Sequence, residues 1–93
     1  MALNFSAQPR VRQEAGKIYV SLQDPTAYVD CRVLAKALSR KAGSLTNAEL
    51  LRVFDQLRSE IEAVANQKFE AKQYDEQQSL KIIWIYPDDL STR

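Results

Sequence analysis

Hydrophobic and polar residues alternate along residues 17–22 and again along residues 27–33. Alternation of this kind, with several β-branched residues at the apolar positions, is typical of half-buried strands. The turn-forming pair Asp24–Pro25 stands between the two stretches, so they predict a β-hairpin. The side chains expected to face the core are Ile18, Val20, Leu22, Ala27, Val29, Cys31 and Val33.

The start of the chain carries a weaker pattern. Leu3 and Phe5 alternate with a polar residue, which predicts a short first strand. Residues 7–16 are largely polar, contain Pro9 and end at Gly16. This composition is typical of a loop or turn, so we expect no strand between residue 5 and the hairpin.

From Leu34 the spacing of apolar residues changes to that of a helix. A first helix is predicted over residues 34–42, with Gly43 at the position where a helix C-cap favours glycine. Thr46 and Glu49 then form a T-x-x-E capping box, which predicts the start of a second helix. Leu45 and Leu50 flank this start as a hydrophobic staple.

The second helix has a long apolar stripe. Apolar residues recur at spacings of four and three from Leu50 to Val64, and no Pro or Gly interrupts the chain before residue 70. A helix from Asn47 to Lys72 would be about 39 Å long at 1.5 Å per residue. That length exceeds the roughly 32 Å diameter expected for a globule of this chain length. The alternative is a helix that ends near Gln67.

Residues 80–86, LKIIWIY, are apolar on both faces of a predicted strand. Ile82 and Trp84 share one face, which we assign to the core. Ile83 and Ile85 share the other face, and a strand that is apolar on both faces is covered on both. Pro87 ends this strand, and a frayed tail is expected from about residue 88.

The element order β-β-β-α-α-β predicts an α+β fold with a small, mostly antiparallel sheet packed on a helical hairpin. A chain of 93 residues is expected to form one domain, residues 1–93. The core positions expected from both layers are Ile18, Val20, Val29, Cys31, Phe54, Leu57, Ile61, Val64, Ile82 and Trp84.

Several sequence features resemble those of one known family. They are the opening LNF, the strand ending VDC with a following AL, the helix LLRVFDQLRSEIEAVA, and a last strand before DDL. They resemble a small bacterial family catalogued as domain of unknown function fourteen eighty-eight. The resemblance covers most of the chain. It implies a compact α+β domain with no established activity, and it carries no catalytic residues over to this sequence.

The composition argues against catalysis. The chain has no His, one Cys and two Gly. It therefore lacks the commonest general base, the usual zinc ligand sets and a glycine-rich phosphate loop. We expect a protein that is not an enzyme, with no catalytic, cofactor-binding or metal-ligating residue. Arg, Lys, Asp, Glu and Tyr can act as acids and bases, so an unusual enzyme is the remaining alternative.

The formal net charge of +1 gives no general attraction to nucleic acid or to an anionic membrane. The chain start lacks an apolar segment of signal-peptide length, and the longest apolar run, Ile82–Tyr86, is too short to cross a bilayer. We expect a cytoplasmic protein without membrane contact. Cys31, on the apolar side of its strand, is expected to be a buried structural residue.

The leading functional hypothesis is a non-enzymatic interaction or regulatory module with an unidentified protein partner. A homodimer is one form of it. Ile83 and Ile85 would lie on a sheet face that a single helical layer leaves open, and Phe69 near the end of the long helix could join the contact. Asp88 and Asp89 are expected to be solvated.

The alternative is a nucleic-acid-binding accessory protein. It would use a basic cluster together with outward-facing tyrosines as stacking surfaces. An ordinary solvated charged face is the competing interpretation of the same residues. The candidate residues are Arg32, Lys36, Arg40, Lys41, Tyr19 and Tyr28, with Arg10, Arg12 and Lys17 as an extension.

Overall fold

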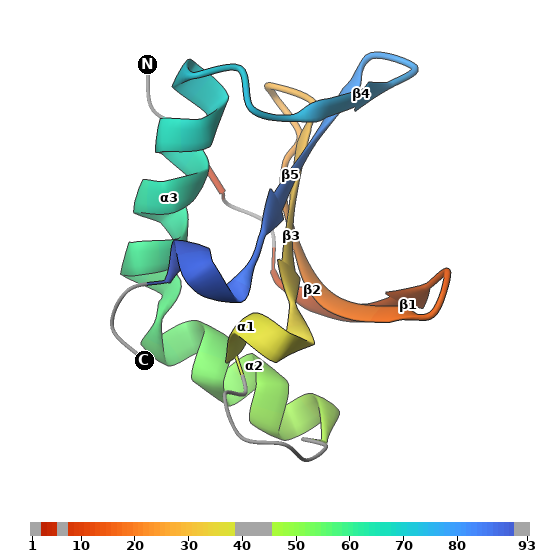
Figure 1. Cartoon of the computed structure of the whole chain (residues 1–93), viewed down its shortest axis with the longest axis vertical. Helices are drawn as coiled ribbons and strands as arrows, with labels where there is room; N and C mark the ends of the chain where they lie inside the picture. The colour runs from red at the N-terminus through yellow and green to blue at the C-terminus, as the bar shows by residue number, and fades with distance from the viewer. Residues whose placement is uncertain (1–2, 6–7, 39–45, 91–93) are drawn as a thin grey trace.

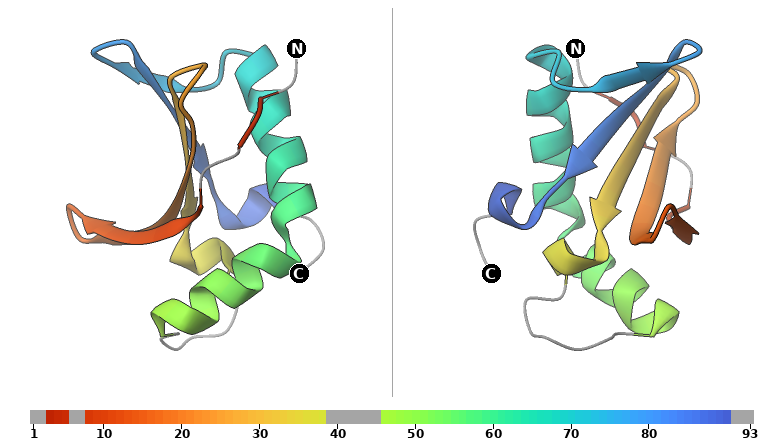
Figure 2. Two further views of the ribbon diagram at one scale, coloured as in Figure 1. Left: turned by 180° about the vertical axis from the view of Figure 1, so that it is seen from behind. Right: turned by 45° about the vertical axis from the view of Figure 1, so that its right-hand side comes forward.

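The computed structural model describes residues 3–5, 8–38 and 46–90. A five-stranded sheet with strand order β1-β2-β3-β5-β4 packs its convex face on the helices, and its concave face points away from them (Figures 1 and 2). The predicted α+β class is confirmed. The elements are β1 (Arg10–Glu14), β2 (Lys17–Asp24), β3 (Val29–Leu34), α1 (Ala35–Leu38), α2 (Asn47–Gln56), α3 (Arg58–Glu70), β4 (Asp75–Gln77), β5 (Leu80–Ile85) and the 3₁₀ helix η1 (Pro87–Asp89).

The sheet is mostly antiparallel, as predicted. β1 and β2, β2 and β3, and β4 and β5 pair antiparallel, whereas the central pair β3 and β5 is parallel. Parallel neighbours need a crossover connection, and the helices between β3 and β5 supply it. The helices therefore lie together on one face of the sheet (Figure 1).

The predicted strand at residues 3–5 is wrong. The Leu3 amide donates to Asn66 Oδ1 at 2.6 Å, and the Asn4 amide donates to Asp24 Oδ2 at 2.7 Å. Side chains thus take the donors that a strand ladder would use. This segment runs beside α3 (Figure 2), with Phe5 buried in the core.

The first strand is instead β1, in the stretch predicted to be a loop. Ala15 and Gly16 both have positive φ, 53° and 76°. Two such residues between the paired Glu14 and Lys17 form the two-residue turn that matches the twist of a hairpin. β1 is therefore determined by this turn and by pairing with β2, because its own sequence has little hydrophobic alternation.

The β2–β3 hairpin is confirmed, although Ala27, expected to face the core from the second strand, lies in the turn and is only partly buried. Val29, Cys31 and Val33 are buried on the helix side as expected. Ile18 is 43% exposed and not a core residue. It lies beside the β1–β2 turn, where the hairpin curves away from the helices (Figure 1).

The predicted continuous helix is two helices, with a break at Leu57. The capping box at Thr46 is confirmed, since its side chain accepts from the Glu49 amide and the Glu49 side chain accepts from the Thr46 amide. Beyond the break, α3 ends at Glu70. The longest extent of the protein is 34 Å, shorter than the 39 Å of a straight helix.

The break lets each half contact a different part of the sheet. α2 contacts β1 and β2, and α3 contacts β5. The twist of a sheet points these strands in different directions, so one straight helix cannot cover both. Gly43 and Leu45, predicted to cap and staple the neighbouring helix ends, lie outside the described residues.

The two faces of β5 are the reverse of those predicted. Ile83 and Ile85 are fully buried in the core under the helices. Register explains the reversal, because Ile83 pairs with Cys31 and Ile85 with Val33, whose side chains face the helices. Residues directly opposite in a sheet share a face, so Ile82 and Trp84 lie on the other side.

The end of the described chain is ordered, in contrast to the predicted fraying. Pro87–Asp89 forms η1, and Leu90 is 1% exposed in the core. β4 is an additional strand that the pattern did not indicate. It joins β5 through a tight turn at Gln78 and Ser79, both with positive φ (49° and 75°).

Candidate functional site

The sheet face opposite the helices carries a contiguous group of polar, charged and aromatic side chains. Cross-strand register places them together, since partners directly opposite point to the same side. One row across the sheet runs from Arg10 through Ser21 and Arg32 to Trp84. We define the concave face by the side chains of Arg10, Arg12, Glu14, Lys17, Tyr19, Ser21, Gln23, Asp30, Arg32, Ile82 and Trp84.

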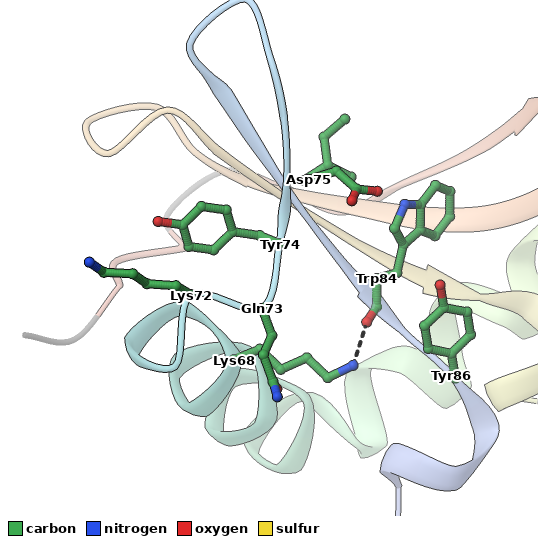
Figure 3. Close-up of a pocket in the computed structure, with 8 residues that line it drawn as sticks. Lys68, Lys72, Gln73, Tyr74, Asp75, Trp84 and Tyr86 are labelled. Atoms are coloured by element: carbon green, nitrogen blue, oxygen red, sulfur yellow. Dashed lines mark hydrogen bonds between the residues drawn. The ribbon is translucent and has the colours of Figure 1, made fainter.

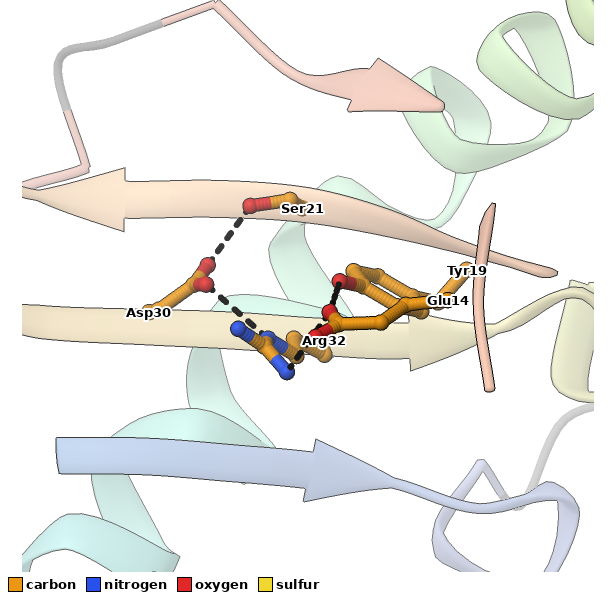
Figure 4. A network of polar contacts seen from close by, with 5 residues as sticks. All are labelled: Glu14, Tyr19, Ser21, Asp30 and Arg32. Carbon is orange, nitrogen blue, oxygen red and sulfur yellow. Dashed lines mark hydrogen bonds and ion pairs between the residues drawn. The ribbon is translucent and has the colours of Figure 1, made fainter. Parts of the chain in front are cut away.

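A buried carboxylate lies at the centre of the concave face (Figure 4). Asp30 is 2% exposed. Its Oδ1 accepts from the Ser21 hydroxyl at 2.6 Å, and its Oδ2 accepts from Arg32 Nε at 2.9 Å. A buried charge is stable only when it is paired and hydrogen-bonded. Arg32 and Ser21 meet that requirement, so this carboxylate holds β2 and β3 together.

Arg32 continues the network toward the β1–β2 turn. Its guanidinium lies 3.7 Å from Glu14 Oε1 and 5.0 Å from the ring centre of Tyr19. The Tyr19 hydroxyl donates to Glu14 Oε1 at 2.9 Å. Burial, followed by this hydrogen bond to Glu14, raises the pKa of Tyr19 above its usual value. Tyr19 is therefore a neutral, structural phenol.

Trp84 is enclosed by other side chains of the same face. Tyr19 meets its ring edge-on, with centroids 5.4 Å apart. Lys17 Nζ lies 5.0 Å from the ring centroid and the Arg32 guanidinium carbon 5.4 Å. These cations take up the electron-rich ring surface. A hollow of about 150 Å³ remains between Trp84 and the turn at Ala15.

A larger hollow of about 340 Å³ lies over the start of β1 and the end of β2. Its lining holds two guanidiniums and no carboxylate. Neither the Arg10 nor the Arg12 guanidinium has a hydrogen bond or ion pair to any residue that the structure describes. We call this hollow the arginine hollow; its lining residues are Gln8, Arg10, Arg12, Ser21 and Gln23.

A hollow of about 480 Å³ lies between the end of α3 and β5 (Figure 3). Lys68 Nζ reaches across it and donates to the Trp84 carbonyl at 2.8 Å and to Asp89 Oδ2 at 2.7 Å. Asp89 also accepts from the Tyr86 amide at 2.8 Å. Because β4 pairs only with the first half of β5, these side chains bind backbone groups of the remaining edge.

Two of the predicted nucleic-acid residues do not form the expected stacking pair. Tyr19 is 1% exposed, which contradicts the prediction that it faces outward into solvent. Tyr28 is 66% exposed in the turn between β2 and β3. Tyr19 pairs with Leu34 at the far end of that hairpin, whereas Tyr28 precedes its start. The structure therefore separates the two rings.

The predicted basic cluster is also divided. Arg32 lies on the concave face and is neutralised by Asp30 and Glu14. Lys36 is exposed on α1. Arg40 and Lys41 lie outside the described residues. Arg10 and Arg12, part of the predicted extension of the cluster, lie on one face of β1 without an ion pair among the described residues. The pattern Arg-x-Arg before the Ala15–Gly16 turn is the sequence signal for this pair.

The predicted self-association residues are not on an open face. Ile83 and Ile85 are buried by the protein's own helices, so their assignment to a dimer surface is wrong. Phe69 packs against the core with its ring centroid 5.9 Å from that of Tyr74. These contacts follow from the reversed orientation of β5.

The described residues offer little chemistry of other kinds. Cys31 is fully buried, and burial raises the pKa of its thiol to about 12. Within residues 3–5, 8–38 and 46–90 no three His, Cys, Asp or Glu side chains gather as a metal site. Over the same residues no helix is long and apolar enough to span a bilayer.

The fold and this face define an α+β domain whose sheet carries a polar and aromatic concave surface. The chain belongs to the family described as "Protein of unknown function (DUF1488)", whose model matches residues 3–82. The matched region includes β1, β2, β3, α1, α2, α3 and β4. No curated protein and no solved structure matches the chain.

Proposed function

We propose that this protein is a non-enzymatic binding module and that the concave face is its binding surface. The observation that carries the proposal is the pair Arg10 and Arg12, which line a hollow without an acidic partner among the described residues. Arginine offers a fork of donors suited to oxyanions. Two unpaired guanidiniums on one strand are available to a ligand without breaking an internal contact.

The other polar side chains of the face support binding rather than catalysis. Asp30, Arg32, Glu14 and Tyr19 hydrogen-bond or ion-pair with one another. A general acid or base must have its acidic or basic atom within reach of a substrate. On the concave face those atoms are hydrogen-bonded or ion-paired to neighbouring side chains, and the Cys31 thiol is buried with a raised pKa. Mutual pairing gives the face a fixed shape.

Nucleic-acid binding through aromatic stacking has less support. Tyr19 is buried, and Lys17 and Arg32 lie over the Trp84 ring. A base would have to displace these cations in order to stack. Self-association remains a prediction from the sequence and has no surface assigned to it, because Ile83 and Ile85 are core residues.

Site-specific photocrosslinking in the native cells tests the proposal. A photoreactive amino acid replaces Gln23 or Lys17 on the concave face, and Arg52 or Ala63 on exposed positions of α2 and α3 provides the matched controls. We expect a discrete crosslinked species from the concave positions only. The captured molecule should keep its mass after incubation with purified protein. Crosslinks from the helical positions alone, or a chemically altered partner, would refute the proposal.

A further inference from the structure

We propose that the free edge of β1 binds an extended acidic segment of a partner protein, whose carboxylates enter the arginine hollow. This inference rests on the proposed function and specifies the partner. Strand addition of this kind supplies affinity through main-chain hydrogen bonds and specificity through alternate side chains. β1 offers an unpaired backbone edge and two arginines at alternate positions.

The outer edge of β1 is unpaired within the described residues. β1 is the first strand in the sheet order and pairs only with β2. Paired residues of an antiparallel ladder alternate between hydrogen-bonded and non-hydrogen-bonded pairs. A two-residue turn makes the flanking Glu14–Lys17 pair hydrogen-bonded, so the backbone groups of Val11 and Gln13 point away from β2. These groups are positioned to pair with an added strand.

The opposite end of the sheet is different. There Lys68 and Asp89 already bind the Trp84 carbonyl and the Tyr86 amide beyond the end of β4. Blocking side chains of this sort are one way in which proteins prevent edge pairing. The edge strand at that end, β4, has three residues, whereas β1 has five. β1 is therefore the longer of the two edges that the described sheet offers to a partner.

The side chains of β1 specify an acidic partner. Arg10 and Arg12 are two residues apart on one face, about 6.6 Å along the strand at 3.3 Å per residue. An added strand with acidic residues at positions i and i+2 would place two carboxylates beside them at the same spacing. Opposite charges in neighbouring strands stabilise the pairing. Gln8 and Gln23 supply further amide donors at the same hollow.

The same arginines make a second copy of this chain a weaker match. Two antiparallel β1 edges would place Arg12 opposite an arginine of the other copy, which is destabilising, although one register also pairs Arg10 with Glu14. A nucleic acid is less well matched, because Glu14 and Asp30 lie on the same face and the net charge of the chain is only +1. An acidic strand satisfies both the backbone and the charge pattern.

Fluorescence anisotropy with synthetic peptides tests this inference. The probe is fluorescein-labelled Thr-Glu-Val-Glu-Val-Glu-Thr, and the control peptide is Thr-Glu-Glu-Val-Val-Glu-Thr, which has the same composition and no acidic pair at i and i+2. We expect the alternating peptide to bind about tenfold more tightly, a difference of about 1.4 kcal/mol. Equal affinity for the two peptides, or no binding of either, would overturn the inference.

Protein variants assign the contact to β1. Arg10→Gln with Arg12→Gln should weaken binding of the alternating peptide about tenfold or more, because charge-assisted hydrogen bonds are lost. Arg52→Gln with Lys72→Gln removes the same charge from exposed positions of the helical layer and should leave binding unchanged. Circular dichroism checks that both variants are folded. Equal losses in the two variants would indicate general electrostatics and refute a site at β1.

Two further arms separate the remaining outcomes. In a bound strand, only every second peptide amide faces β1. N-methylation of these amides should abolish binding, and N-methylation of the intervening amides should leave it intact. A 20-nucleotide oligothymidine that binds more tightly than the peptide would refute the acidic-strand partner. If crosslinks from Gln23 or Lys17 persist while no acidic peptide binds, the binding module stands and this inference fails. If both fail, the proposed function is wrong as well.

Discussion

Removal of the Asp30 carboxylate tests the physical account of the concave face. Asp30→Ala leaves the Ser21 hydroxyl without its acceptor. It also leaves Arg32, whose side chain is 16% exposed, with only Glu14 at 3.7 Å. The change therefore leaves one mostly buried cation and one buried hydroxyl insufficiently paired.

The expected loss of stability depends on how deeply Asp30 and its partners are buried. Breaking a fully buried ion pair from one side costs about 3–5 kcal/mol. Arg32 retains some solvent contact and Glu14, so we expect Asp30→Ala to lower the free energy of unfolding by about 2–3 kcal/mol. Asp30→Asn keeps an acceptor and loses the charge, and should cost about 1–2 kcal/mol. The total free energy of unfolding of a chain of this size is about 5–14 kcal/mol, so these variants are expected to stay folded.

Urea unfolding measures these losses by circular dichroism, with the fluorescence of Trp84, the one tryptophan of the chain, as a second probe. A double-mutant cycle of Asp30→Ala with Arg32→Met isolates the pair. We expect a coupling of about 1–2 kcal/mol, within the range for residues in direct contact. A loss below about 1 kcal/mol for Asp30→Ala, or additive single variants, would refute the role of Asp30 as the central tie between β2 and β3.

Three further predictions concern the core and the helix start. Ile83→Thr should lower the free energy of unfolding by about 2–4 kcal/mol, because it buries a hydroxyl and opens space under the helices. Ile18→Thr, at a 43% exposed position, should lower it by less than about 1 kcal/mol. Equal urea midpoints for the two variants would contradict the orientation of β5. Thr46→Ala should cost about 1 kcal/mol through loss of the N-cap, and an unchanged midpoint would contradict it. Burial raises the pKa of the Cys31 thiol from 9.0 to about 12, so the unfolded chain releases this proton first and stability should fall as pH rises from about 9 to 12. Cys31→Ala should lose this part of the pH dependence, and a native thiol that reacts rapidly at neutral pH would oppose the assignment.

The sequence by itself determined the local elements of this protein. The β2–β3 hairpin follows from alternation and an Asp-Pro turn, and the start of α2 follows from the capping box of Thr46 and Glu49. The burial of Cys31 follows from its place on the apolar side of β3. These signals lie within a few residues of the structure that they specify, so each can be recognised without knowing the rest of the fold.

Only the tertiary structure decided which side of β5 is the core. Residues 80–86 are apolar at both alternate sets of positions, and a strand of that kind is oriented by its partner's register alone. The break at Leu57 has a similar cause, because it depends on the direction in which a twisted sheet presents β1, β2 and β5.

The concave face likewise depends on pairing between distant segments. β1 is a strand because β2 lies beside it and the Ala15–Gly16 turn connects them. That pairing brings Arg10 and Arg12 beside Ser21 and Tyr19, and curvature of the hairpin brings Lys17 over Trp84. Periodicity reports which side chains share a face of one element. Which elements are neighbours, and hence which charges remain unpaired, is decided by hydrogen bonds and packing between residues far apart in the chain.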